Sequence, residues 1–410
     1  MARKNKVKVV MPLGNVAIKL LGIDGKIGKV RGSVYEVRNL IAVPSYHPSF
    51  ILRGMWKEEP TWFNDFLKAR ELSLKKWKKI KENFNIEPSV EEIEKFTELV
   101  VSEGKTVAVD IETTSLNEYY SKIIMIGFAR DGENALVVPF LKQGGSSYWR
   151  LHEEIKVRNC VMKILREVPL MFQNALFDTL HLEQHGYKCG FVKEDTMLLH
   201  HCISPELPHN IGYIVSVYGK TPYWKDTVLG AASKMVELDQ TEVRTYNARD
   251  TVTLHQVLPD MLKHIRSIGT EKVYREVSMP LVPVLRRMTQ NGLPLDRKKL
   301  TALGRQFKKA TEKYDKELRA LCDLPELFNF DSGDHLRMLI YGEEPKGMKK
   351  IREQLVEYDL NPKLKKTTKK YKTLVDRAGV IMRTLPLYQT SGKRGQRAAV
   401  SEQRTRKRCL

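Results

Sequence analysis

The stretch KTVAVDIETTSL, residues 105–116, places two acidic side chains at the end of an apolar run. Side chains alternate between the two faces of a β-strand, so Val107, Val109 and Ile111 are expected to share one face and Asp110 and Glu112 the other. Two carboxylates that point the same way repel each other unless a cation lies between them. The pair is therefore either a hydrated strand end without function or half of a metal site.

Two later segments carry acids in similar settings. PLMFQNALFDTLHLEQHG, residues 169–186, is typical of a buried strand that runs into a helix, with Asn174 and Asp178 near the junction. TEVRTYNARDTVTLHQVL, residues 241–258, is typical of an amphipathic helix, on which Tyr246 and Asp250 lie four residues apart on one face. Each feature alone is ordinary, but their order and spacing together are not.

The set DIE, NALFD and YNARD resembles the three motifs of the DEDD 3′→5′ exonucleases, in the subclass with tyrosine in the last motif. The segments DIETTSL, DTMLLHHCISPELPHNIGYIVSVY and PYWKD are similar to the proofreading domain of phage and bacterial family A DNA polymerases, of the DNA polymerase I type. This resemblance covers roughly residues 100–270. It implies an RNase H-like fold, divalent metal ions and hydrolysis from the 3′ end.

The resemblance also implies a role for each acid. Asp110 would bridge two ions, Mg²⁺ or Mn²⁺, which hard oxygen ligands favour. Glu112 and Asp250 would hold the ion of the nucleophile, and Asp178 would serve the leaving group. Tyr246, with an ordinary phenol pKa of ~10, is a poor base at neutral pH, so we expect it to orient the attacking water.

Three further residues fall at positions that the family uses for substrate binding. Leu116 would wedge against the terminal base, Asn174 would brace the site, and Thr113 would contact the substrate.

The hydrophobic pattern predicts an α/β fold of the same kind. Strand-like runs at 106–112, 122–130 and 135–140 are joined by short links and predict an antiparallel meander. Helical and strand patterns then alternate to about residue 268, which predicts a mixed sheet covered by helices. With the RNase H-like fold that the resemblance implies, we expect three antiparallel strands, then parallel strands, with flanking helices. We expect this domain at 101–270, a helical linker at 56–100, thumb-like helices at 271–345 and a basic, disordered tail at 346–410.

Residues 1–55 resemble the C-terminal half of family 4 uracil-DNA glycosylases, through PLGNVAIKLLG, KVRGSVYE and VPSYHPSFILR. His47 occupies the position of the histidine that hydrogen-bonds the flipped base in that family. The first half of the family's fold, its acidic motif and its cluster cysteines are missing. We therefore expect an incomplete α/β segment that remains as a packing or DNA-contact element.

Downstream, EVSMPLVPVLRRMTQNGLPLD and LFNFDSGDHLRMLIYG resemble the start of the family A polymerase thumb. The palm and fingers motifs are absent, so polymerase activity is not expected from this chain alone. The chain would then be a truncated or split polymerase, and a separate palm and fingers subunit is one expected partner.

The composition agrees with a partner that is a polyanion. The 410 residues include 70 Lys and Arg against 49 Asp and Glu, a formal charge of +21. Such an excess favours nucleic acid. No apolar run approaches the ~20 residues of a membrane span, and the five scattered cysteines form no C-x-x-C. The sequence predicts a cytoplasmic protein, in the host cytoplasm if it is viral.

These observations favour a metal-dependent 3′→5′ exonuclease that acts on the single-stranded 3′ end of DNA, as in proofreading. Two alternatives stay open. One is an RNase D-like RNA exonuclease, and the other is a non-catalytic DNA-binding subunit of a polymerase.

Overall fold

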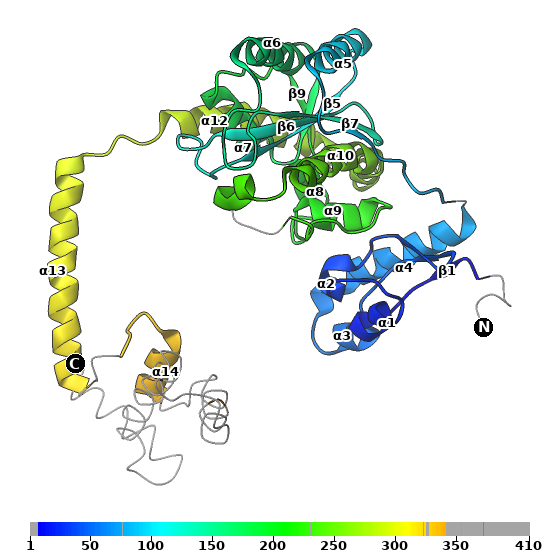
Figure 1. Ribbon diagram of the computed structural model, residues 1–410. Helices are drawn as coiled ribbons and strands as arrows, with labels where there is room; N and C mark the ends of the chain where they lie inside the picture. Colours follow the sequence, from blue (N-terminus) through cyan, green and yellow to red (C-terminus); the bar gives the residue numbers. More distant parts are fainter. Residues whose placement is uncertain are drawn as a thin grey trace. The chain divides into compact units, whose positions relative to one another are not determined.

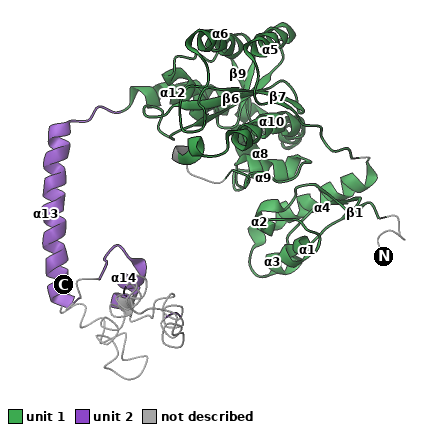
Figure 2. Cartoon of the chain, viewed as in Figure 1, with its two compact units in different colours: residues 1–292 green, residues 293–410 purple. Residues whose placement is uncertain are grey.

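The computed structural model describes residues 7–75, 77–228, 232–322, 324 and 328–341, together with residues 354 and 372. The chain divides into two compact units, residues 1–292 and 293–410 (Figure 2). The tail expected at 346–410 lies outside the described residues except for positions 354 and 372.

A six-stranded mixed sheet is the centre of the first unit, as expected. Its order is β4-β7-β6-β5-β8-β9 (Figure 1). The antiparallel meander consists of β5 (Val107–Thr113), β6 (Ile123–Ala129) and β7 (Asn134–Pro139). β8 (Leu170–Phe172) pairs parallel to β5, and β9 (Val192–Asp195) parallel to β8. The expected α/β class and mixed sheet are confirmed.

One strand was not expected. β4 (Asn83–Asn85) lies within the segment that the sequence indicates as a helical linker, and it pairs parallel to β7 at the edge of the sheet. Its residues, Asn-Phe-Asn, lack the apolar run that predicts a strand.

Helices cover both faces of the sheet (Figure 1). α5 (Val90–Glu103) and α6 (Leu151–Glu167) pack in one core with Val107, Val109 and Ile111 of β5. α8 (Thr196–Ile203), α9 (Ile211–Tyr218) and the long α10 (Gln240–Ile268) pack in the other core, with Ala108. The alternation of β5 therefore directs Asp110 and Glu112 toward the face that α10 covers.

The remaining elements of the domain extend this core. α7 (Ala175–Gln184) follows β8, and η2 (Ala232–Glu237) precedes α10. After α10 come α11 (Glu271–Val273), the π-helical turn η3 (Tyr274–Ser278) and α12 (Met279–Asn291). The second unit contains α13 (Arg297–Cys322) and α14 (Gly333–Tyr341). Within the part of the chain that the structure describes, no helix is long and apolar enough to cross a membrane.

The N-terminal segment, residues 7–74, forms a small three-stranded sheet of order β1-β3-β2. Its strands are β1 (Val9–Val10), β2 (Tyr35–Val37) and β3 (Leu40–Ala42). Its helices are α1 (Gly14–Leu20), α2 (Ile27–Val30), α3 (Pro48–Leu52), η1 (Trp56–Glu58) and α4 (Glu59–Leu74).

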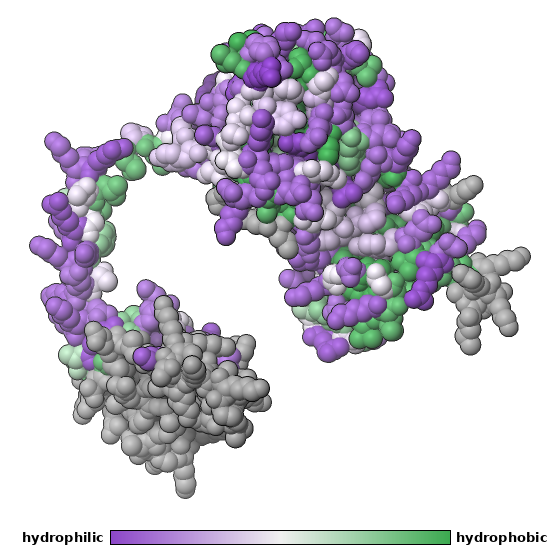
Figure 3. Space-filling model, in the orientation of Figure 1, coloured by the Kyte–Doolittle hydropathy of each residue, from purple (hydrophilic) through white to green (hydrophobic). Residues whose placement is uncertain are grey.

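The core of this segment is small. Two apolar clusters hold only four fully buried residues each. Hydrophobic side chains gather on the visible face of the segment (Figure 3), and its exposed large apolar residues include Val16, Leu20, Leu52 and Phe63. With so little buried apolar surface, the segment depends on other contacts for its order.

Candidate active site

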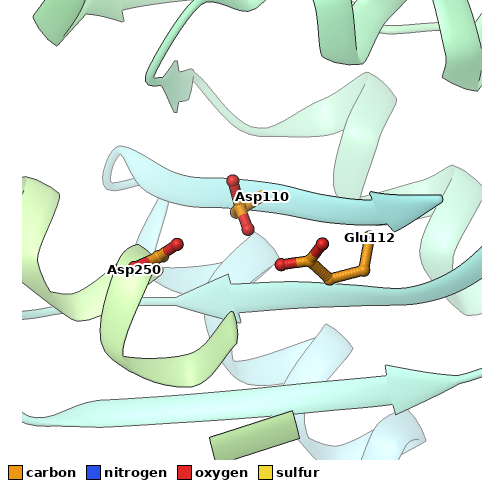
Figure 4. Close-up of side chains that lie close together, drawn as sticks. All are labelled: Asp110, Glu112 and Asp250. Carbon is orange, nitrogen blue, oxygen red and sulfur yellow. The ribbon is translucent and has the colours of Figure 1, made fainter. Parts of the chain in front are cut away.

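Three carboxylates meet above the centre of the sheet. Asp110 and Glu112 project from β5, and Asp250 projects from α10 (Figure 4). One carboxylate oxygen of each lies within 4.8 Å of the others. Asp110 and Glu112 are half-buried, and Asp250 is only 8% exposed. The structure thus brings together residues from two of the three segments that the sequence singled out.

The pKa values of Asp110 and Glu112 are raised in this environment. Loss of solvation and the neighbouring Asp250 raise the pKa of Asp110 to about 8, although Lys225 and Asn247 oppose the shift. Loss of solvation, Asp110 and Asp250 raise the pKa of Glu112 well above its usual range. Carboxylates held this close together repel one another, and a cation between them would stabilise their ionised forms.

Asp178 lies beside this cluster but outside the three-acid group. It is on α7, is 3% exposed and accepts a hydrogen bond from the backbone N–H of Ile111 at 3.3 Å. Burial and the nearby Asp110 raise the pKa of Asp178 well above its usual range. All four acids therefore lie on or beside β5. Asp110, Glu112 and Asp250 form a close group, and Asp178 contacts the strand from α7.

Tyr246 lies one turn before Asp250 on α10 and is half-buried. Burial, Asp250 and Glu112 raise the pKa of its phenol far above the ordinary value. The phenol is therefore neutral in this environment, and its O–H is available as a hydrogen-bond donor.

Asn247 is a site residue that sequence reasoning missed. Its Nδ2 donates to Asp110 Oδ2 at 2.7 Å and to the backbone oxygen of Asp110 at 3.3 Å. The side chain is fully buried. Asn247 follows Tyr246 directly in YNARD, so its place in the motif was known from the sequence. Its hydrogen-bond partner, 137 residues away, could not be predicted.

Trp224 and Lys225 were also missed. Trp224 Nε1 donates to Asp250 Oδ1 at 2.8 Å, and Lys225 Nζ donates to Asp250 Oδ2 at 2.6 Å. Lys225 Nζ also lies 4.0 Å from the centroid of the Tyr246 ring. Both oxygens of Asp250 are therefore oriented by two consecutive residues of one loop. The segment PYWKD was noted in the sequence, but these contacts were not predicted.

The start of α7 is held in an unusual conformation. Asn174 has a φ of +76°, which is uncommon for a residue other than glycine. Its backbone N–H and that of Ala175 donate to the carboxylate of Asp195 at 3.2 and 2.7 Å. The side chain of Asn174 does not cap the helix. The backbone N–H of Asn174 makes the contact with Asp195, and the bracing role of the residue stays a prediction.

The other predicted substrate-binding residues lie in different surroundings. Leu116, after β5, is 76% exposed, whereas Thr113 is 4% exposed and donates to the backbone oxygen of Ser115 at 2.9 Å. His47 caps α3 in the N-terminal segment, where its Nδ1 accepts from the backbone N–H of Ser49 at 3.1 Å. His47 does not belong to the acidic cluster.

The donor set fits divalent cations. Asp110, Glu112 and Asp250 supply only hard carboxylate oxygens, which suit Mg²⁺ or Mn²⁺. Lys225 forms an ion pair with this group, through Asp250 at 2.6 Å. The three carboxylates can therefore hold a divalent metal ion, with Asp178 alongside.

Comparison with known proteins agrees with this site. Residues 79–266 match the family described as 3'-5' exonuclease, so this part of the chain is similar to that family. DNA polymerase I of Pseudomonas aeruginosa is 28% identical over 258 residues, which are 59% of this chain and 27% of that protein. DNA polymerase I of Synechocystis is 25% identical over 285 residues, 67% of this chain and 28% of that protein. The chain spans about a quarter of the length of these curated relatives.

Solved structures share part of the arrangement at low similarity. Brucella melitensis NrnC with bound Mg²⁺ is 16% identical, covering 52% of this chain and 95% of that one, with a TM-score of 0.36. Escherichia coli RNase D, an exoribonuclease, is 15% identical, covering 51% of each chain, with a TM-score of 0.39. Neither the glycosylase resemblance of residues 1–55 nor the role of His47 is supported by these comparisons.

Proposed function

We propose that this protein is a divalent-metal-dependent exonuclease that hydrolyses DNA one nucleotide at a time from the 3′ end, as a proofreading activity does. The observation that carries the proposal is the group of Asp110, Glu112 and Asp250 within 4.8 Å, on a domain that matches a 3'-5' exonuclease family. A binding subunit without catalysis would have no use for three carboxylates held this close together.

The residues of the site would have different roles. Asp110, Glu112, Asp250 and Asp178 would hold two divalent ions, which supply a water activated as nucleophile and stabilise the charge that develops on the phosphate. Tyr246 presents a neutral phenol that orients the attacking water by a hydrogen bond, since burial and the nearby acids raise its pKa far above the ordinary ~10. Asn247 and Trp224 keep the carboxylates in fixed orientations.

Leu116 would contact the terminal nucleotide. It is a large apolar side chain with 76% of its surface exposed, next to the strand that carries Asp110 and Glu112. An exposed apolar side chain can stack against or wedge beside a base in any sequence context. The formal charge of +21 adds an attraction for the phosphate backbone that does not depend on sequence.

The test uses 5′-labelled single-stranded DNA and RNA of the same sequence, with Mg²⁺ or Mn²⁺. We expect a ladder of DNA products that shortens from the 3′ end and disappears with chelator. Asp110→Ala removes this activity, whereas Asp260→Ala, an exposed aspartate on the same helix as Asp250, retains it. Full activity of Asp110→Ala contradicts the proposal. Faster shortening of RNA favours the RNase D-like alternative.

A further inference from the structure

The loop that orients Asp250 is fastened to the N-terminal segment. We call residues 219–228 the Asp250 loop, because Trp224 and Lys225 within it donate to both carboxylate oxygens of Asp250. The loop follows α9 and precedes residues that the structure does not describe. The loop also forms hydrogen bonds with residues between 29 and 71, which lie 149 to 197 positions earlier in the chain.

Several hydrogen bonds join the N-terminal segment to the loop itself, among them the ion pair of Lys220 with Glu71 at 3.0 Å. The backbone N–H of Val34 donates to the oxygen of Thr221 at 3.1 Å, and the N–H of Tyr223 donates to the hydroxyl of Tyr35 at 3.3 Å. Lys29 Nζ donates to Asp226 Oδ1 at 2.8 Å. These contacts lie on both sides of Trp224 and Lys225, so they fix the position of the two residues between them.

The base of the loop is held by buried charges. Lys68, 6% exposed, donates its three N–H groups to the backbone oxygens of Ser216 at 2.6 Å, Gly219 at 2.7 Å and Gly32 at 2.7 Å. Arg31, 2% exposed, donates to Ser216 Oγ at 3.0 Å and pairs with the buried Asp65. A buried ammonium that satisfies three carbonyls on two segments ties these segments together.

We propose that the N-terminal segment is a positioning element of the nuclease site, which acts by holding the Asp250 loop so that Trp224 and Lys225 orient Asp250. This inference rests on the proposed metal site, but not on the nucleic acid that the site cleaves. Residues that orient a metal-ligating carboxylate from outside change metal affinity by about 10- to 100-fold when they are lost. The segment therefore contributes to metal binding without contributing a ligand.

A glycine-to-alanine substitution tests whether the N-terminal segment holds the loop. Gly32 has a φ of +69°, and an added Cβ would lie 2.2 Å from the backbone oxygen of Ser216, so Gly32→Ala forces the N-terminal segment and α9 apart. Gly22→Ala is the matched control, because Gly22 has a φ of +73° in the same segment but no atom within 4 Å of an added Cβ. Both variants place an alanine at a positive φ and therefore share the backbone strain. Only Gly32→Ala also adds a steric clash with Ser216.

Two readouts need no substrate. Hydrogen exchange of the amides of residues 219–228 reports the loop, and titration with Mn²⁺ followed by electron paramagnetic resonance reports the site. In Gly32→Ala with a native circular dichroism spectrum, we expect faster exchange in the loop and about 10-fold weaker Mn²⁺ binding. We expect wild-type behaviour of Gly22→Ala. Wild-type Mn²⁺ affinity or unchanged loop exchange in folded Gly32→Ala overturns the inference.

A charge reversal decides the question if Gly32→Ala does not fold. Lys29 and Asp226 are 49% and 38% exposed, so Lys29→Glu leaves the core intact but repels the loop. We expect roughly threefold weaker Mn²⁺ binding, restored in Lys29→Glu/Asp226→Lys. Unchanged affinity in Lys29→Glu, or no recovery in the double variant, overturns the inference. If the wild type binds Mn²⁺ but does not shorten DNA, the proposed function fails while this result stands.

Discussion

Asn247 Nδ2 lies 2.7 Å from Asp110 Oδ2, and the absence of a side chain at Gly127 makes this contact possible. Gly127 pairs with Asp110 across β5 and β6, and a Cβ there would lie 2.2 Å from Asn247 Oδ1. The conformation of Asp110 thus depends on a glycine in the neighbouring strand and an amide on the helix above it.

Removing this amide should reduce activity without unfolding the protein. We expect Asn247→Ala to lower the exonuclease rate and the Mn²⁺ affinity by about 10- to 100-fold, because Asp110 loses the donor that orients it. Gly127→Ala should destabilise the protein by overpacking, and the double variant Gly127→Ala/Asn247→Ala should regain stability but not activity. Rates and urea unfolding measure the two effects separately. A fully active Asn247→Ala would contradict this role.

The orientation of Asp110 is one feature that could be predicted from the sequence. The alternation of VAVDIET places Asp110 and Glu112 on one face, because the period of a strand is two residues and depends on no distant partner. Tyr246 and Asp250 share a helix face for a similarly local reason. The expected three-stranded meander and the mixed sheet follow from the same patterns, and both are confirmed.

The donors around the acids could not be predicted in this way. Asn247 reaches Asp110 across 137 positions, and Trp224 reaches Asp250 across 26, through a loop without periodicity. The N-terminal segment was expected to be a remnant without a core of its own, since it looks like half of a larger fold. Its buried Lys68 and Arg31 are ordinary surface residues in the sequence, and their burial is explained by partners that only the fold brings together, among them Asp65 and Ser216.

Lys68 should therefore matter far more to stability than its residue type suggests. Lys68→Met leaves three buried backbone oxygens without a donor, and we expect a loss of about 3–5 kcal/mol in the free energy of unfolding. Lys75→Met is the control, because Lys75 is largely exposed and loses only its ion pair with Glu71. It should cost at most about 0.5 kcal/mol. Equal effects of the two substitutions, in chemical denaturation, would refute the role of Lys68.

His200 should make the protein less stable in acid. Burial and three neighbouring histidines, His209, His264 and His201, lower the pKa of His200 from its usual value of 6.5 to about 4. Between these values the unfolded chain binds a proton that the folded chain does not, so stability falls as the pH decreases from 6.5 to 4. We expect His200→Phe to reduce the loss of unfolding free energy between pH 6.5 and pH 4, by up to about 2–3 kcal/mol. Urea unfolding at several pH values measures it, and identical slopes would contradict the prediction.

Leu116 should affect substrate handling and not stability. Since its side chain is 76% exposed, Leu116→Ala should change the free energy of unfolding by less than about 0.5 kcal/mol. If it contacts the terminal base, the same substitution should weaken the binding of DNA by about 1–2 kcal/mol, because an apolar contact is worth about 0.8 kcal/mol per buried CH₂. Binding of a 3′-terminated strand in calcium, compared with Leu151→Ala as an exposed control on α6, distinguishes the two roles. Equal affinities of the two variants would exclude the contact.

Metal ions should stabilise the protein most at alkaline pH. The pKa of Asp110 is about 8 in the folded chain without metal, against ~3.9 for an ordinary aspartate, so the unfolded chain releases this proton first. Stability is therefore lost as the pH rises from about 4 to 8, and a cation that binds the ionised group restores it. At ten times its dissociation constant, Mn²⁺ should add about 1.4 kcal/mol.

Asp110→Asn separates this effect from general salt effects. The amide cannot ionise, so we expect the metal-free variant to exceed the wild type in unfolding free energy at pH 8, by on the order of 2 kcal/mol, and to match it near pH 5. The same variant should lose most of the increment from Mn²⁺, because the ion loses its shared ligand. Thermal denaturation with chelator or with Mn²⁺ at both pH values provides the four comparisons. A variant that Mn²⁺ stabilises as much as the wild type would show that Asp110 does not bind the ion.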